Sequence, residues 1–292
     1  MMKSILASLN GTGSDVSVLE TAAVAQKMFD ATVDCLHVKF DAGGPEALLA
    51  YAVAPGNSLP SQRLRALGSH LTDTAEKARS AFGDFCHRHK LALKAPASGP
   101  DRRDFRFQET IGLELDETIR QSRYRDLLVV GRGAPNDSAD IDRLGTIVLG
   151  SGRPVLIAPH KAAATLVRRV VIAWKDTAEA AAAVTAAMPF LSKAQEIVVA
   201  VTNHDEVPPS ETKQAGELLA AQLRHHGLEV KVKFLPYDAT SAGGRLLEYC
   251  YGVDADLLVM GGYGHSRLQE NVFGGVTREI LSNCDLPVLM TH

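Results

Sequence analysis

A glycine-rich segment near the end of the chain has the spacing best suited to chemistry. Two residues separate Gly261 from Gly264, and nine more separate Gly264 from Gly274, with Gly275 directly behind it. Glycines in a turn permit positive φ and let backbone N–H groups come close to a ligand. A phosphate would meet these donors and the positive end of the helix expected next. The segment therefore predicts a phosphate or nucleotide site; the alternative is a tight turn that binds nothing.

Polar and aromatic side chains surround this segment. His265, Ser266 and Arg267 add hydrogen-bond donors. A guanidinium can hold a phosphate bidentately, although a solvated Arg267 at the rim is the simpler interpretation. Trp174, the single tryptophan, closes an expected strand, where a base could stack on it. The alternative for Trp174 is an aromatic at the edge of the core.

Other reactive residues form weaker patterns. Residues 86–89, Cys-His-Arg-His, could offer ligands to a divalent cation. Residues two apart on a helix do not share a face, however, so solvated histidines at a helix end are the simpler interpretation. The chain has neither Gly-x-Ser-x-Gly nor the P-loop pattern Gly-x4-Gly-Lys-Ser/Thr. No catalytic residue is predicted, and ligand binding is favoured over catalysis.

The elements that would position these residues occur twice. Residues 126–131, Asp-Leu-Leu-Val-Val-Gly, match residues 256–261, Asp-Leu-Leu-Val-Met-Gly. Residues 153–157, Arg-Pro-Val-Leu-Ile, match residues 286–290, Leu-Pro-Val-Leu-Met. An Asp before four apolar residues and a Gly after them indicates a buried strand that opens into a tight turn. The chain is therefore predicted to be a tandem duplication.

Each copy is expected to alternate strands with helices, which forces parallel pairing and places ligands at the carboxyl ends of the strands. Strands are expected at 5–9, 32–38, 91–94, 126–131 and 153–157, then at 170–174, 196–201, 229–235, 256–261 and 286–290. Helices are expected at 16–29, 61–89 and 109–123, then at 178–191, 210–226, 242–251 and after the glycine segment. An insertion at about residues 40–60 is expected as a surface loop; a short helix at 45–51 that covers the crevice is the alternative.

With this spacing and this duplication, the chain resembles the universal stress protein family, in particular its tandem two-domain members. The resemblance covers nearly the whole chain, and Gly261, Gly264 and Gly274 match the family's Gly-x2-Gly-x9-Gly motif. It implies two Rossmann-like, doubly wound α/β domains, residues 1–160 and 167–292. Each would be a five-stranded parallel sheet in the order 3-2-1-4-5, flanked by helices. The two domains would pair through their last strands as a pseudo-dimer, which leaves a homodimer of whole chains open.

The chain departs from the family's ATP-binding pattern at three places. Gly275 stands where the motif has Ser or Thr, and Lys175 stands where an Asp follows the first strand. A lysine cannot accept a hydrogen bond, so recognition of a base or ribose there must differ. In the first copy, Asn10 takes the Asp position and residues 131–135, Gly-Arg-Gly-Ala-Pro, lack the Gly-x2-Gly spacing. The first copy is therefore predicted to be degenerate as a nucleotide site.

The resemblance implies a stress-response regulator whose second domain binds an adenine nucleotide such as ATP, with Mg²⁺ if the nucleotide carries it. One alternative, favoured by Lys175 and Gly275, is a scaffold that acts through protein–protein contacts; another is a slow ATP hydrolase. The candidate nucleotide-binding residues are Trp174, Lys175, Val201, Met260, Gly261, Gly264, His265, Ser266, Arg267, Gly274, Gly275, Val276 and Thr277.

The composition narrows the classes of partner. The formal net charge is -3 and no block of like charge occurs, so a nucleic-acid partner is not expected. No apolar run approaches the ~20 residues needed to cross a bilayer, so no membrane partner is expected. The 4 cysteines show no Cys-x-x-Cys spacing, which is typical of a protein in a reducing cytoplasm.

Overall fold

The described residues of the computed structural model are 2–39, 60–91, 105–134, 137–202, 208–236, 241–262 and 274–292, with the backbone alone for 60–72. The strands of the first copy are β1 Ser4–Ser8, β2 Thr32–Lys39, β3 Phe105–Ile111, β4 Leu127–Val130 and β5 Val155–Ile157. Those of the second copy are β6 Arg169–Trp174, β7 Glu196–Thr202, β8 Val230–Leu235, β9 Leu257–Gly261 and β10 Val288–Thr291. The helices are α1 Asp15–Phe29, α3 Pro60–His89, α4 Glu114–Ser122, α5 Ser138–Ser151, α6 Ala178–Leu191, α7 Pro209–His225, α8 Ala242–Gly252 and α9 Gly275–Asn283.

The described strands form one continuous sheet in the order β3-β2-β1-β4-β5-β10-β9-β6-β7-β8. Within each copy the strands are parallel and follow the predicted order 3-2-1-4-5. The copies meet where β5 pairs antiparallel with β10, with Leu156 opposite Leu289. The doubly wound α/β fold and the pairing of the copies through their last strands are therefore confirmed.

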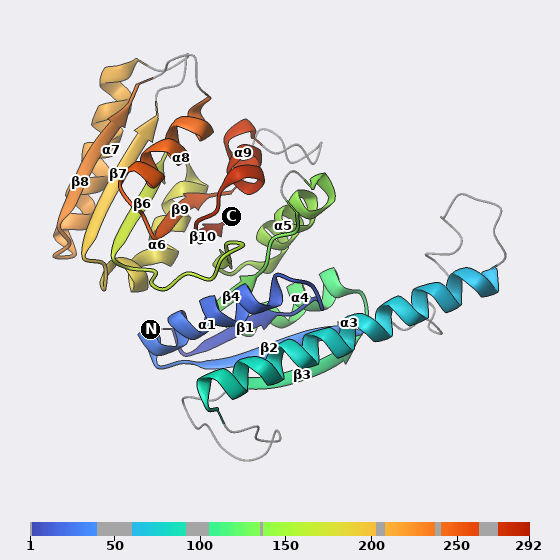
Figure 1. The fold of residues 1–292 in the computed structure, drawn as a ribbon. Helices are drawn as coiled ribbons and strands as arrows, with labels where there is room; N and C mark the ends of the chain where they lie inside the picture. Colours follow the sequence, from blue (N-terminus) through green and yellow to red (C-terminus); the bar gives the residue numbers. More distant parts are fainter. Residues whose placement is uncertain are drawn as a thin grey trace.

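Helices cover both faces of this sheet (Figure 1). Apolar side chains of α1, α3, α6 and α7 pack on one face, and those of α4, α5, α8 and α9 pack on the other. Each apolar layer contains residues of both copies. In the layer of α1 and α6, the ring centroids of Phe29 and Phe190 lie 4.9 Å apart with an interplanar angle of 88°. The two copies therefore share a core on each face of the sheet.

An aspartate before the fourth strand of each copy fixes the start of the first strand. The Asp126 carboxylate accepts the N–H groups of Lys3 at 2.7 Å and Ser4 at 3.0 Å. Asp256 accepts those of Arg168 at 2.9 Å and Arg169 at 2.8 Å. The Asp that opens each repeated segment thus hydrogen-bonds the start of the fourth strand to the start of the first strand. Both copies make this contact, so the duplication includes it.

The sequence prediction was wrong for the third strand of the first copy. A strand was expected at residues 91–94, of which 92–94 lie outside the described residues; the third strand of the sheet is β3, Phe105–Ile111, which also occupies the first part of the helix expected at 109–123. Alternate residues of β3 face α3, where Phe105 lies 4.8 Å from Phe85 and Phe107 lies 5.3 Å from Phe82, measured between ring centroids. This period-two packing on α3 accounts for the strand at residues 105–111.

The remaining predicted helices agree with the structure within a few residues. The insertion at about residues 40–60, with the short helix considered at 45–51, lies outside the described residues. The amino-terminal part of α3 extends past the sheet (Figure 1). None of the helices in the described part of the chain combines the length with the apolar run needed to cross a bilayer.

Candidate functional site

Three predicted site residues meet at the carboxyl edge of the second copy's sheet. Trp174 is the last residue of β6 and pairs in register with Val201 of β7. On the other side of β6, Ala173 pairs with Met260 of β9. Because these strands are parallel, their carboxyl ends open on the same edge of the sheet. Trp174 and Val201 therefore lie side by side with their side chains in the layer of α6 and α7, whereas Met260 packs into the layer on the opposite face of the sheet.

Gly261 allows a close approach between β9 and helix α6. A Cβ atom built on Gly261 would lie 2.5 Å from the backbone N of Ala180 and 2.6 Å from the carbonyl carbon of Glu179. Thr177 caps α6 by accepting the N–H of Ala180. The first of the predicted glycines is therefore required by packing, whatever binds beside it.

The neighbouring Gly262 faces the first copy. Its N–H donates to Thr291 O at 2.9 Å, and a Cβ atom on it would lie 3.0 Å from Cγ1 of Val148 in α5. The residue after the β9 glycine therefore belongs to the contact between the copies.

Gly274 and Gly275 lie at the start of α9, on open space. Gly274 is the N-cap residue and offers no side-chain acceptor to the first turn. No atom of the described residues lies within 4 Å of a Cβ atom built on either glycine, and neither has a positive φ. Their glycine character is therefore set by neither packing nor backbone strain among the described residues. Val276 and the buried Thr277 complete the first turn, while Gly264, His265, Ser266 and Arg267 lie outside the described residues.

Trp174 and Lys175 differ in exposure at this edge. The Trp174 ring packs, partly buried, against the apolar layer of α6 and α7, as expected for an aromatic at the core edge. Its Nε1 is buried and has no hydrogen-bond partner among the described residues. Lys175 is exposed in the β6–α6 turn, where its carbonyl accepts the N–H of Thr177 at 2.8 Å. The edge thus offers a buried indole donor and an exposed cation.

In the first copy, a carboxylate of the protein occupies the turn after β1. Asp15 is 1% exposed and accepts the N–H groups of Asn10 and Gly11, each at 2.9 Å. Burial raises the pKa of Asp15 and outweighs these hydrogen bonds and the nearby His37, which lower it. A Cβ atom on Gly11, which has φ 70°, would overlap the backbone of Thr74, so α3 packs directly onto this turn.

Carboxylates also occupy the turn after β4. Gly133 N–H donates to Asp140 Oδ2 at 2.6 Å, and Asp137 caps α5 by accepting the N–H groups of Ala139 at 3.0 Å and Asp140 at 3.4 Å. At the corresponding helix of the second copy, α9, none of the described side chains makes such a cap. Sequence reasoning missed these carboxylates; the signal was an acidic residue within or just before the first turn of α1 and of α5.

The cysteines and histidines set aside in the sequence lie in structural contacts. Cys86 is buried in α3, and Glu20 accepts hydrogen bonds from Arg88 and from His89, the latter at 2.8 Å. All four cysteines are free and buried, and burial raises the pKa of each thiol, that of Cys250 to about 12. Protonated thiols are poor nucleophiles. Within the described ranges, no three His, Cys, Asp or Glu side chains are gathered as metal ligands would be.

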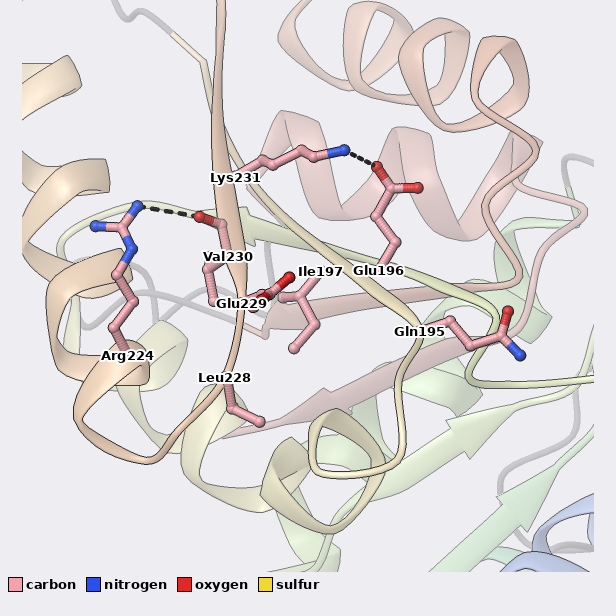
Figure 2. Close-up of a pocket in the computed structure, with 8 residues that line it drawn as sticks. All are labelled: Gln195, Glu196, Ile197, Arg224, Leu228, Glu229, Val230 and Lys231. Carbon is pink, nitrogen blue, oxygen red and sulfur yellow. Dashed lines mark hydrogen bonds and ion pairs between the residues drawn. The ribbon is translucent and has the colours of Figure 1, made fainter.

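A pocket of about 510 Å³ lies at the opposite, amino-terminal edge of β7 and β8. Figure 2 shows Lys231 reaching Glu196 and Arg224 reaching the carbonyl of Val230, at 2.8 and 3.0 Å. Glu196 also accepts a hydrogen bond from Nε of Arg169, at 2.6 Å. Lys231, Arg224 and Glu196 are thus already paired with groups of the protein. The pocket therefore offers a ligand fewer unpaired polar groups than the carboxyl edge does.

The sequence of the second copy and the fold of the whole chain are similar to those of known proteins. Residues 166–292 match the model of the Universal stress protein family. A universal stress protein from Archaeoglobus fulgidus DSM 4304 superposes with a TM-score of 0.64 at 15% identity, over 99% of this chain and 97% of that chain. A functionally unknown protein from Pseudomonas aeruginosa PAO1 superposes with a TM-score of 0.56 at 11% identity, over 99% and 92%. No curated protein is similar enough in sequence to match the chain. The structural likenesses show the fold alone.

Proposed function

Because residues 166–292 match the model of the universal stress protein family, we propose that this second copy binds one adenine nucleotide, such as ATP, and that the chain acts as a stress-response regulator. The nucleotide lies across the carboxyl ends of β6, β7 and β9. Its phosphates face the start of α9, with Mg²⁺ where the nucleotide carries it. Gly264, His265, Ser266 and Arg267 supply further donors from the segment between β9 and α9.

The observation that carries this proposal is the open start of α9. The first N–H groups of a helix have no partner within it, and together with the helix dipole they attract an anion. Among the described residues no side chain caps those of α9, and Gly274 and Gly275 leave room there for a group to approach the backbone. Gly275 brings no hydroxyl group, so backbone donors carry the phosphate contact.

The first domain does not bind nucleotide in this proposal. Asp137 and Asp140 already accept the N–H groups that a phosphate would need, and Asp15 fills the turn after β1. The carboxylates of Asp15 and Asp137 would also repel a phosphate, while Asp140 already pairs with Arg143. The expected stoichiometry is one nucleotide per chain.

A negative charge placed at the start of α9 tests the proposal. Gly275→Asp should lower ATP affinity by at least about tenfold, since a carboxylate next to the phosphate costs more than about 1.4 kcal/mol. Because an acidic residue in the first turn favours a helix, the fold should persist. Affinity is measured by isothermal titration calorimetry and by the fluorescence of Trp174, the single tryptophan.

Ser138→Asp is the matched control, because Ser138 is the exposed first residue of α5 in the first copy. It adds the same charge at the corresponding helix and should leave ATP affinity unchanged. No binding of ATP, ADP or AMP by the wild-type chain at millimolar nucleotide would reject the proposal in favour of a scaffold. Phosphate release in proportion to protein, reduced by His265→Ala or Arg267→Ala, would instead indicate a slow hydrolase.

A further inference from the structure

Arg132 is a buried cation at the boundary between the two copies. It follows Gly131 in the turn after β4, at the position that Gly262 takes after β9. Its side chain is 5% exposed. Nε donates to Ala158 O at 3.3 Å, Nη1 to Leu281 O at 3.3 Å and Nη2 to Leu286 O at 3.2 Å. Two of its three acceptors therefore belong to the other copy.

The acceptors of Arg132 are main-chain carbonyls. Burying a charge is costly unless it is paired and hydrogen-bonded, and burial lowers the pKa of Arg132. No carboxylate oxygen of the described residues lies within ion-pair distance of its guanidinium. Leu281 is in the last turn of α9, where carbonyls lack partners within the helix and the dipole is negative. Arg132 is thus a side-chain cap for the end of α9, and the helix in turn stabilises the buried charge.

A second contact from the first copy's side holds the turn after α9. His160 donates its backbone N–H to Asp285 Oδ1 at 2.9 Å, and its Nε2 lies 3.0 Å from Gly133 O. Tyr251 of α8 accepts the N–H of Asp285 at 2.8 Å. The carboxyl end of α9 is therefore fixed to the turn after β4 of the first copy, while its amino end opens onto the proposed phosphate site.

We propose that Arg132 is a positioning residue for the nucleotide site of the other domain, holding α9 so that its amino-terminal N–H groups face the phosphates. This inference rests on the function proposed above. The turn that in the first copy lacks the Gly-x2-Gly spacing thereby supports ligand binding by the second copy. Arg132 touches no ligand and acts through the helix.

Arg132→Met keeps the apolar stem and removes the five donors. We expect ATP affinity to fall about 5- to 10-fold, because the variant loses the charged hydrogen bonds by which Arg132 holds the end of α9. Hydrogen–deuterium exchange should become faster in α9. Arg132→Lys, with its charge at a single centre, should give an intermediate loss. Affinity is followed by calorimetry and Trp174 fluorescence on the full chain.

Phe29→Leu is the control, since it weakens a different contact between the copies, against Phe190 in α6. It should lower stability, leave ATP affinity unchanged and leave exchange in α9 unchanged. Unchanged affinity in Arg132→Met, unchanged exchange in α9, or an equal loss of affinity in Phe29→Leu would each overturn this inference alone. Absence of ATP binding by the wild-type chain would overturn the proposed function, and this inference with it.

Discussion

Glycines at the second site are required for different physical reasons. Gly261 lies against the backbone at the start of α6, so a side chain there has no room. Gly275 faces open space at the start of α9 and has an ordinary φ. The sequence presents both as members of one spacing pattern. Only the packing separates the glycine that the fold needs from the glycine available to a ligand.

Alanine at these two positions should therefore have opposite effects on stability. Gly261→Ala places Cβ 2.5 Å from a backbone nitrogen, and forcing strand and helix apart should cost about 1–3 kcal/mol. Gly275→Ala should be neutral or stabilising by up to about 1 kcal/mol, because alanine favours the helix. Urea unfolding of both variants measures the difference. Equal free energies of unfolding would contradict the assigned close approach.

At the scale of elements, most strands and helices could be predicted because their residues are locally periodic. The strand β3 was missed because it is an edge strand whose polar residues, such as Arg106 and Gln108, alternate with Phe105 and Phe107. Its pairing with β2 and its packing on α3 are long-range contacts that local patterns do not contain. The repeated aspartate was noticed in the sequence, but its hydrogen bonds to the first strand appear only in the fold.

Asp126→Asn tests this connection between strands. Burial raises the pKa of Asp126, but the N–H groups of Lys3 and Ser4, the Ser4 hydroxyl and the charge of Arg153 together lower it by more, so its pKa in the folded chain is below the ordinary value. Such a group stabilises the fold above the unfolded pKa of about 3.9, and the stabilisation is lost as pH falls through the lower folded pKa. The variant should lose about 1–3 kcal/mol at pH 7.

The difference between wild type and Asp126→Asn should shrink as pH falls below about 4. Urea unfolding at pH 7 and near pH 3 measures it, with the exposed Asp142→Asn as control. A loss of the same size at both pH values would show that the carboxylate charge is not what stabilises this connection.

At the scale of the whole molecule, the duplication gives a continuous sheet with a two-sided core. The antiparallel contact of β5 with β10 uses an edge strand from each copy, and α1 and α6 pack beside it. Both copies keep the fold, but they differ at the carboxyl edge. Carboxylates occupy the turns of the first copy, while no side chain in the described part of the chain caps the helix start of the second copy.

A double-mutant cycle of Phe29→Leu and Phe190→Leu measures how strongly the copies are joined. The two rings meet edge to face, so their coupling free energy should be about 0.5–1.5 kcal/mol. Free energies of unfolding by urea for the four proteins give the coupling. Additive losses would indicate that this contact does not join the copies, and two separate transitions would show that they unfold independently.

The sequence by itself determined the duplication and the candidate edge, because buried parallel strands and glycine turns leave local patterns that repeat, and the resemblance to the universal stress protein family implied the strand order that the structure confirms. It placed Trp174, Val201 and Met260 at strand ends that do meet. Only the tertiary structure decided which N–H groups at these edges already have a partner. It also showed that Arg132 of one copy caps a helix of the other. The contacts of Arg132 with Leu281 and Leu286 join residues 149 and 154 positions apart, so their physical cause, the pairing of buried polar groups, exists only after folding.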